Sequence, residues 1–270
     1  GSPVSYWVSE RITNIFGECE PLSSIVEGRV GLMTSDNDRF LRYFWEIGRQ
    51  ATCFDAMEDD SAAESGKKWF PHNKGGSPRK WAGNYEYVVN WGNYGEEIKQ
   101  TVLEKYPYLN GNPNFVVHDD GFYFKPFVGW SHTSSELAFR YYGPSFTSNV
   151  KGMSVFTKSP DVSLEALLMY LNTKFVSSVA PILNPSLSFG INNLYGLPAA
   201  ISQSKQTSLD ARKLISTAKS DWDAYETSWD FTTLPLLSPY NRGDTLEATY
   251  SRLRTHWQGM TDEMQRLEEE

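Results

Sequence analysis

Short aromatic or β-branched runs alternate along the chain with segments of helical periodicity. The predicted strands are 40–47, 85–91, 122–130, 137–142 and 153–157. The predicted helices are 4–17, 96–109, 164–183, 208–228 and 244–270. Leu164, Leu167, Leu168 and Leu171 share one helical face, so we expect the 164–183 helix to pack on the sheet.

Two stretches interrupt this pattern. Residues 55–66 are acidic and small, which predicts a loop, and residues 67–84 gather Gly, Pro, Asn and basic residues. The second stretch reads as a long loop, a feature that is often functional in compact domains. The sequence therefore predicts a mixed α+β (α/β) fold, a sheet with packed helices and a C-terminal helical segment. The predicted divisions are an entry helix or linker at 1–20, an α/β domain at 21–205 and a helical segment at 206–270.

Composition limits the possible partners. A chain of 270 residues with 40% hydrophobic content can bury a large core. The net charge of −8 argues against a generic nucleic-acid binder, so any DNA contact must be local. Cys19 and Cys53 show neither metal spacing nor a disulfide framework, which suits the cytoplasm. We read no signal peptide, and the apolar runs are too short to span a bilayer, so no membrane partner is expected.

Residues 65–85 form a local basic segment in this acidic protein. They contain no Asp or Glu, and tryptophans and glycines lie between the cations. Lys and Arg contact phosphates, whereas Arg and Asn also read base edges, so the segment predicts a DNA-binding loop. The alternative is an ordinary solvated loop with aromatic anchors. The candidates here are Lys67, Lys68, Asn73, Lys74, Arg79, Lys80 and Trp81.

Two smaller polar clusters are further candidates for DNA contact. The first contains Asn37 and Arg39, for which a turn or helix N-cap is the alternative interpretation. The second contains Ser131 and His132, followed by Arg140, and its alternative is a polar turn beside a buried tryptophan.

Signals for catalysis are poor. Methylation of an exocyclic amine needs a Gly-rich cofactor loop and an Asn/Asp-Pro-Pro-aromatic tetrad, and neither is intact here. The nearest tetrads, at 112–115 and 184–187, both lack the second proline. The histidines have no metal-ligand spacing: they are His72, His118, His132 and His256. We expect no catalytic residues, no metal and no bound cofactor in this chain.

Several longer blocks, in order, resemble a known family. They include GRVGLMTSDNDRFLRYFWEI, KKWFPHNKGGSPRKWAGNYEYVVNWGNYGEEIK and GWSHTSSELAFRYYGPSF, followed by LLMYLNTKFV, NPSLSFGINNLYGLP and SDWDAYETSWDFTTLPLL. Together, over roughly residues 5–235, they resemble the C-terminal half of the BREX-type adenine-specific DNA methyltransferases of phage defence. The family's Asn-Pro-Thr-Leu-Asn-Phe appears at 184–189 with two replacements.

The resemblance implies a DNA target-recognition domain without its N-terminal catalytic domain. The tag-like Gly1-Ser2-Pro3 and the abrupt helical end lead us to expect an excised fragment. The implied partners are double-stranded DNA, the missing catalytic domain and other BREX subunits. The whole enzyme would use S-adenosylmethionine to methylate adenine at N6.

Two other functions remain open from sequence. The basic loop suits a docking module for other defence proteins or for a phage DNA mimic. An acidic chain rich in Trp and Tyr also resembles carbohydrate-active hydrolases, for which Asp119, Asp120 and Glu136 are the available carboxylates.

Overall fold

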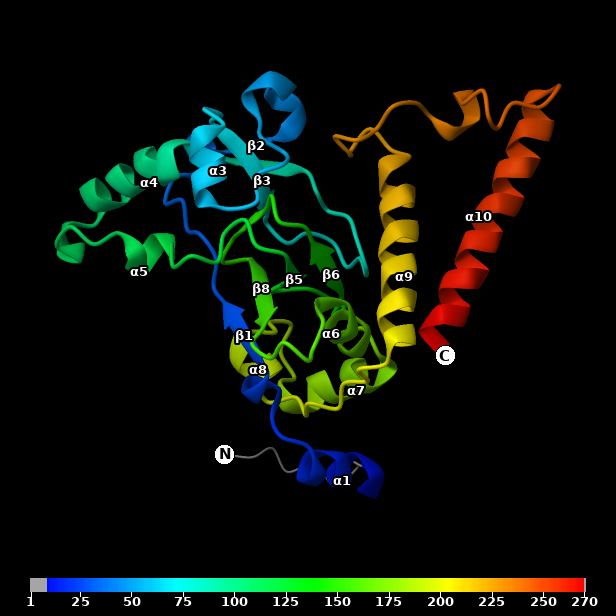
Figure 1. Ribbon diagram of the computed structural model, residues 1–270, viewed down its shortest axis with the longest axis horizontal. Coiled ribbons are helices and arrows are strands. Elements are labelled where there is room, and N and C mark those ends of the chain that lie inside the picture. The colour runs from blue at the N-terminus through cyan, green and yellow to red at the C-terminus, as the bar shows by residue number, and fades with distance from the viewer. Residues whose placement is uncertain (1–8, 270) are drawn as a thin grey trace.

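The computed structural model describes residues 9–269, which fold around two four-stranded sheets (Figure 1). The first sheet is antiparallel throughout and has the order β1 (Val26–Arg29), β8 (Gly152–Thr157), β5 (Phe127–Ser131), β6 (Phe139–Tyr142). The second has the order β2 (Leu41–Tyr43), β4 (Tyr87–Asn90), β3 (Trp69–Asn73), β7 (Thr147–Ser148). Only the pairing of β3 with β7 is parallel. The mixed α+β class predicted from sequence is confirmed.

Asn73 joins the two sheets. The chain leaves the second sheet at Ser148 and enters the first at Gly152. Across this short link Asn73 accepts from Asn149 N at 3.0 Å and donates from Nδ2 to Gly152 O at 3.0 Å. A Cβ on Gly152 would lie 2.5 Å from the Asn73 carbonyl oxygen, so only glycine permits this approach. The link fixes the end of β3, from which the basic loop departs.

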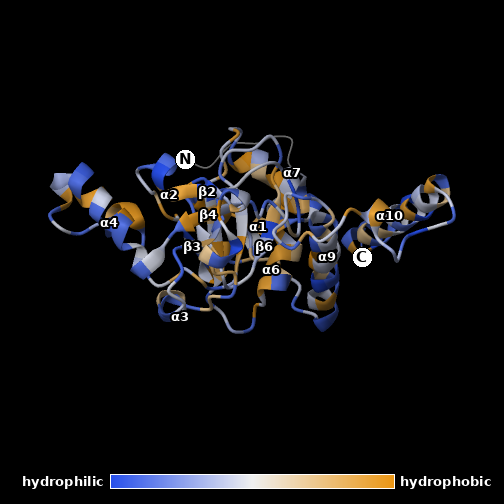
Figure 2. Ribbon diagram, turned by 90° about the horizontal axis from the view of Figure 1, so that it is seen from above, coloured by the Kyte–Doolittle hydropathy of each residue, from blue (hydrophilic) through white to orange (hydrophobic). Residues whose placement is uncertain are grey.

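The helix α6 (Leu164–Leu171) covers the first sheet and contacts β5, β6 and β8. Its leucines at positions 167, 168 and 171 are buried, and α9 (Lys205–Asp223) packs on its other side through Leu214 and Ala218. Figure 2 shows the hydrophobic colour gathered on α6. Packing of the 164–183 segment on the sheet is therefore confirmed, although the segment is not one helix.

Asn172 breaks the predicted 164–183 helix. Its side-chain amide donates to the carbonyl oxygen of Phe139 on β6 and accepts from the same residue's N–H, both at 3.0 Å. Thr173 then caps a new helix, α7 (Lys174–Leu183), by accepting from Val176 N. The two helices meet at a bend of 68°.

A second apolar core lies under the second sheet. There α4 (Gly92–Lys105) buries Ile98 and Val102 near Phe70 of β3. The backbone turns left-handed from Asn93 to Gly95 before the regular helix begins. The remaining helices are α1 (Glu10–Glu18), α2 (Asn37–Phe40), α3 (Asp59–Glu64), α5 (Asn114–Val117), α8 (Ile191–Tyr195) and α10 (Leu246–Glu269).

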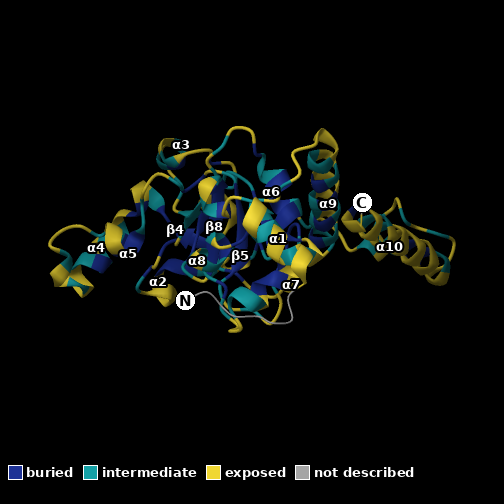
Figure 3. Cartoon of the chain, turned by 90° about the horizontal axis from the view of Figure 1, so that it is seen from below, coloured by how far each residue is buried: buried dark blue, intermediate teal, exposed yellow. Residues whose placement is uncertain are grey.

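The long helix α10 lies beside α9 at one side of the molecule (Figure 1). Most of its residues are at least partly exposed, in contrast to the buried strands (Figure 3). Leu253 and Leu267 are its buried leucines, and Leu267 joins the core of the first sheet. The C-terminal turn of α10 is thereby held near the body of the molecule.

Several predicted elements agree with the structure and others are wrong. The strands predicted at 85–91, 137–142 and 153–157 correspond to β4, β6 and β8. The 55–66 segment contains α3, and the 67–84 segment begins with β3, so neither is a loop throughout. The helix predicted at 4–17 corresponds to α1 over its described residues. Residues 4–8 of that prediction lie outside the described residues. The divisions after residues 20 and 205 stay predictions.

No single helix within residues 9–269 is both long and apolar enough to cross a membrane. The bent pair α6 and α7 passes by length and composition only when the two are counted together, and α6 is largely buried against the first sheet.

Candidate nucleic-acid interface

The basic segment begins beside α4, where two cations share one carboxylate. Lys68 Nζ lies 2.7 Å from Glu97 Oε1, and Arg39 Nη2 lies 3.5 Å from Glu97 Oε2. The lysine contact is the main reason why the pKa of Glu97 is below its usual value. Lys67 instead donates to the carbonyl oxygen of Gln50. Arg39 and Lys68, from separate sequence clusters, are thus brought together.

The other end of the segment is covered by the C-terminal helices. Arg79 pairs with Asp221 of α9 at 2.5 Å, and its guanidinium lies 5.2 Å from the Trp222 ring centroid. Lys80 pairs with Glu268 of α10 at 3.0 Å. The same carboxylate accepts a hydrogen bond from Trp81 Nε1 at 2.8 Å.

The ion pairs divide the cations of the basic segment among three helices. The cations of residues 67–80 point to different elements, and three of the five form ion pairs with carboxylates. Their partners lie far away in the sequence, so the absence of acids within the segment did not reveal them. Paired cations remain able to bind phosphate only if they exchange one anionic partner for another.

Arg140 supports the loop from inside. It is fully buried and donates to the carbonyl oxygens of Ser77 and Arg79 at 3.3 and 3.2 Å, and to Ser131 Oγ at 3.3 Å. Ser131 in turn donates to Gly76 O at 2.8 Å. These bonds hold the backbone of residues 76–79 against the first sheet.

Four candidates thus belong to the interior: Asn73, Trp81, Ser131 and Arg140. Sequence reasoning selected them because their side chains can read or stack on bases. In the folded chain their polar groups are used internally, and no base edge could reach them without rearrangement. We leave these four residues out of the proposed contact set.

The candidates Asn37 and Lys74 meet in an exposed groove of about 410 Å³, which Arg42 and Tyr87 also line. Lys74 Nζ lies 5.1 Å from the centroid of the Tyr87 ring, and partial burial lowers the pKa of Lys74. Among the described residues, no carboxylate forms an ion pair with Lys74 or with Arg42. The carboxylates of Asp38 and Glu46 also line this groove, so its two cations lie near acidic groups without forming ion pairs with them.

His132, the remaining candidate, is partly exposed on the loop after β5. Its backbone N–H donates to Lys151 O at 2.8 Å, so it lies next to the link between the sheets. The same loop forms one wall of a cavity of about 520 Å³ to which Lys80 also contributes. His132 is not part of the groove that holds Lys74.

Sequence reasoning missed Arg42, Trp45 and Arg49. The run FLRYFWEI at 40–47 was taken as a strand, whereas β2 ends at Tyr43 and a 3-10 turn, Phe44–Glu46, follows. That turn leaves Trp45 52% exposed. The signal that could have identified these residues is in the sequence: Arg42 and Arg49 lie on either side of the aromatic residues 43–45.

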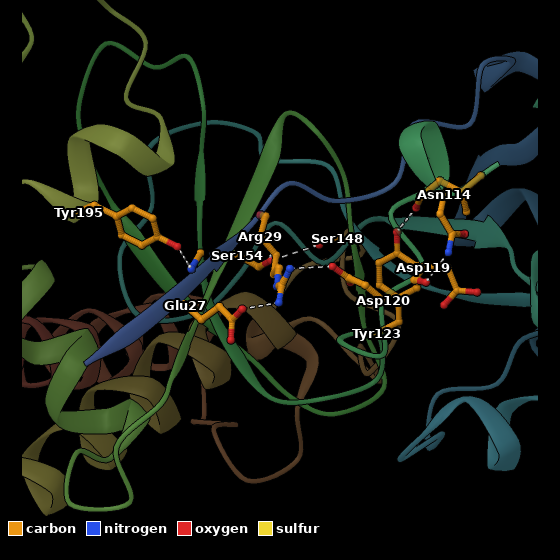
Figure 4. A network of polar contacts seen from close by, with 11 residues as sticks. Glu27, Arg29, Asn114, Asp119, Asp120, Tyr123, Ser148, Ser154 and Tyr195 are labelled. Carbon is orange, nitrogen blue, oxygen red and sulfur yellow. Dashed lines mark hydrogen bonds and ion pairs between the residues drawn. The ribbon is translucent and has the colours of Figure 1, made fainter. Parts of the chain in front are cut away.

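Two of the three carboxylates nominated for a hydrolase, Asp119 and Asp120, are engaged in ion pairs, and the third, Glu136, lines the cavity of about 520 Å³. Asp120 Oδ2 lies 2.8 Å from Arg29 Nη1 on β1, and Asp119 Oδ2 lies 2.6 Å from Lys99 Nζ. Figure 4 shows Asp120 directed at Arg29, which also pairs with Glu27. The structure gives no support to the hydrolase alternative.

Residues 90–96 run from the end of β4 through a glycine-containing turn into α4, which is the order of elements in a Gly-rich cofactor loop. This turn does not fit a cofactor. A Cβ on Gly95 would meet the Trp91 ring at 2.6 Å, and one on Gly92 would meet the Lys68 backbone at 3.3 Å. These glycines are required by contacts within the chain. Within residues 9–269, no three His, Cys, Asp or Glu side chains form a group that could hold a metal.

Comparison with known proteins identifies relatives over nearly the whole chain. The adenine-specific methyltransferase PglX of Lacticaseibacillus casei (strain Zhang) is 33% identical over 97% of this chain. The adenine-specific methyltransferase BrxX of Escherichia coli O9:H4 (strain HS) is 30% identical over 86% of it. The chain spans only 21% and 18% of these relatives, about a fifth of their length. No model of a protein family matches the chain.

Proposed function

We propose that this chain, a homologue of one region of the adenine-specific methyltransferases PglX and BrxX, is the DNA target-recognition region of such an enzyme. The observation that carries the proposal is the similarity over 97% of the chain to a fifth of a named methyltransferase. The region would hold double-stranded DNA while the catalytic region elsewhere in the enzyme methylates adenine at N6, within a BREX defence system in the cytoplasm.

The cofactor belongs to the whole enzyme in this proposal. S-adenosylmethionine would supply the methyl group from the catalytic region, and the glycine turn at residues 90–96 does not fit it. This chain would position the DNA and supply the sequence specificity of methylation. Other BREX subunits are further proposed partners of the same surface.

The groove that holds Asn37, Arg42 and Lys74 is the proposed point of contact. Arg42 and Lys74 would bind phosphate oxygens, because neither forms an ion pair within the described residues. Asn37 lies beside them and has the side chain that reads adenine edges. Further contacts proposed for the same duplex are Arg39, Lys67, Lys68, Arg79, Lys80 and His132.

Salt-dependent binding of duplex DNA by this chain tests the proposal. Fluorescence anisotropy with labelled duplexes, from low to physiological salt, gives the slope of log affinity against log salt. Among the described residues, Arg42, Arg49 and Lys74 are in or near the groove and form no ion pair with a carboxylate. Phosphate contacts by these three alone correspond to a slope of about −2.7. Absence of binding at low salt, or a slope near zero, would contradict it.

The whole methyltransferase provides a second test. Changing the residues equivalent to Arg42 and Lys74 to Gln should raise the DNA concentration needed for half-maximal methylation and leave binding of S-adenosylmethionine unchanged. Loss of cofactor binding would instead indicate a role in the catalytic region.

A further inference from the structure

A small aromatic pocket lies next to the groove. Its volume is about 170 Å³, well below the roughly 300–1,000 Å³ of pockets for drug-sized ligands. Two distant parts of the chain form it, the segment from β2 to residue 54 and Trp229 after α9. Its lining residues are Phe44, Trp45, Ile47, Arg49, Phe54 and Trp229. A space of this size suits one planar ring system.

Trp45 is held flat at the edge of this pocket. Its ring stacks on Tyr43 with centroids 4.5 Å apart and an interplanar angle of 6°. Tyr43 stacks in turn on Tyr87, at 4.6 Å. These contacts support Trp45 from the side of the groove, yet the residue remains 52% exposed. A rigid, supported and exposed indole is a ready stacking surface.

The opposite wall is also aromatic and rigid. Trp229 lies 5.0 Å from the Phe54 ring and 5.9 Å from the Phe44 ring, the latter edge to face. Its other contacts, with Tyr85 and Phe146, anchor it to the buried core. The pocket is therefore built by the fold and does not depend on a free loop.

One cation lines the pocket, and the adjoining groove holds two cations and two carboxylates. Arg49 lies 5.3 Å from the Phe54 centroid and donates to Trp229 O at 2.7 Å. Within the described part of the chain it forms no ion pair with a carboxylate. Arg42 and Lys74 lie in the adjoining groove, on the other side of the Tyr43–Trp45 stack. Positive charge at an aromatic pocket disfavours a cationic ligand, such as a methylated ammonium, and favours a flat ring that carries an anion.

We propose that this pocket binds a nucleobase that has left the DNA stack, with its ring against Trp45 and its flanking phosphate near Arg49. The inference rests on the proposed function. An enzyme that flips its target base leaves the opposite base without a partner, and an aromatic surface can receive that base. Stacking on aromatic side chains tolerates any base, so this contact would add affinity without adding sequence preference.

Two duplexes of the same sequence test the pocket. One is fully paired, and the other carries 2-aminopurine opposite an abasic site, which leaves that base without a partner. The unmodified chain should bind the second duplex more tightly and quench its fluorescence. Trp45→Ala should reduce that preference about 5- to 150-fold and restore the fluorescence, with paired-duplex affinity nearly unchanged. Trp45→Phe should restore part of the preference.

Tyr240→Ala is the matched control, because Tyr240 is an aromatic residue that is 97% exposed and lines none of these cavities. A Trp45→Ala chain with an unchanged circular dichroism spectrum that keeps the full preference would overturn the inference. Displacement of the base by a neutral oligosaccharide would also overturn it.

Failure of the proposed function gives a different result. In that case the unmodified chain binds neither duplex, and a single-stranded oligonucleotide containing 2-aminopurine becomes the probe. Quenching that Trp45→Ala abolishes would still support the pocket, whereas equal fluorescence with both chains would reject it.

Discussion

Lys80 and Glu268 form an ion pair of 3.0 Å although 188 residues separate them in the chain. The Glu268 carboxylate also accepts from Trp81 Nε1. The last turn of α10 thereby forms an ion pair with Lys80, a cation that the sequence analysis predicted to contact DNA. A phosphate approaching Lys80 must compete with this carboxylate.

Replacing Glu268 by Gln should increase affinity for duplex DNA. The change removes the anionic partner of Lys80 and keeps a side chain that can accept from Trp81. Because both paired side chains are about one third exposed, we expect an increase of about two- to five-fold at low salt. Fluorescence anisotropy measures it. Glu269→Gln removes the same charge one residue along, and an equal increase there would point to net charge alone.

Lys74 should matter more for DNA binding than its paired neighbours. Lys74→Gln removes a cation that forms no ion pair within residues 9–269, so affinity should fall for all sequences and the salt slope should become shallower by about 1. Lys68→Gln should have a smaller effect, because Lys68 is paired with Glu97. Anisotropy titrations at several salt concentrations compare the two variants. Equal effects would show that the pairing with Glu97 does not restrain Lys68.

Elements that depend on their own periodicity could be predicted from the sequence. The strands β4, β6 and β8 and the helices α4, α9 and α10 follow local patterns. The break at Asn172 could not, because its amide bonds to Phe139 on a strand 33 residues earlier. The acidic and small residues at 55–66 predicted a loop. The Ser61 hydroxyl, however, accepts from the backbone N–H of Glu58 and caps the start of the helix α3.

The candidate site shows the same limit. Charge along the sequence identified the cations, but their carboxylate partners come from α4, α9 and α10. Arg140 was chosen for its guanidinium, which the fold buries under the loop. Which cations form ion pairs depends on the carboxylates that lie near them in space. Only the folded chain shows these neighbours.

Arg140→Met should destabilise the protein. The variant keeps much of the side-chain volume but leaves the carbonyl oxygens of Ser77 and Arg79 without their donor. We expect a loss of about 2–5 kcal/mol in the free energy of unfolding, measured by urea denaturation. Arg212→Met removes an exposed ion pair with Glu165 and should cost under about 1 kcal/mol. Similar losses in both variants would contradict a structural role for Arg140.

His72 should make the protein sensitive to acid. It is fully buried on β3, with Nδ1 2.7 Å from Thr147 Oγ1. Burial lowers the pKa of His72 to about 3, from an ordinary value of 6.5, and the charge of Lys74 adds to the effect. Between these two values the unfolded chain binds more protons than the folded chain. The free energy of unfolding should therefore fall with decreasing pH, by about 1.4 kcal/mol for each unit below 6.5.

Urea denaturation at pH 7.5 and pH 4.5 measures this contribution of His72. The unmodified protein should lose about 3 kcal/mol more on acidification than His72→Gln, which has no group to protonate at that position. The absolute stability of the variant does not matter, because only the difference between the two pH values is compared. His256→Gln, on the exposed side of α10, is the control and should follow the unmodified protein. If His72→Gln loses as much stability as the unmodified protein, other groups cause the acid sensitivity.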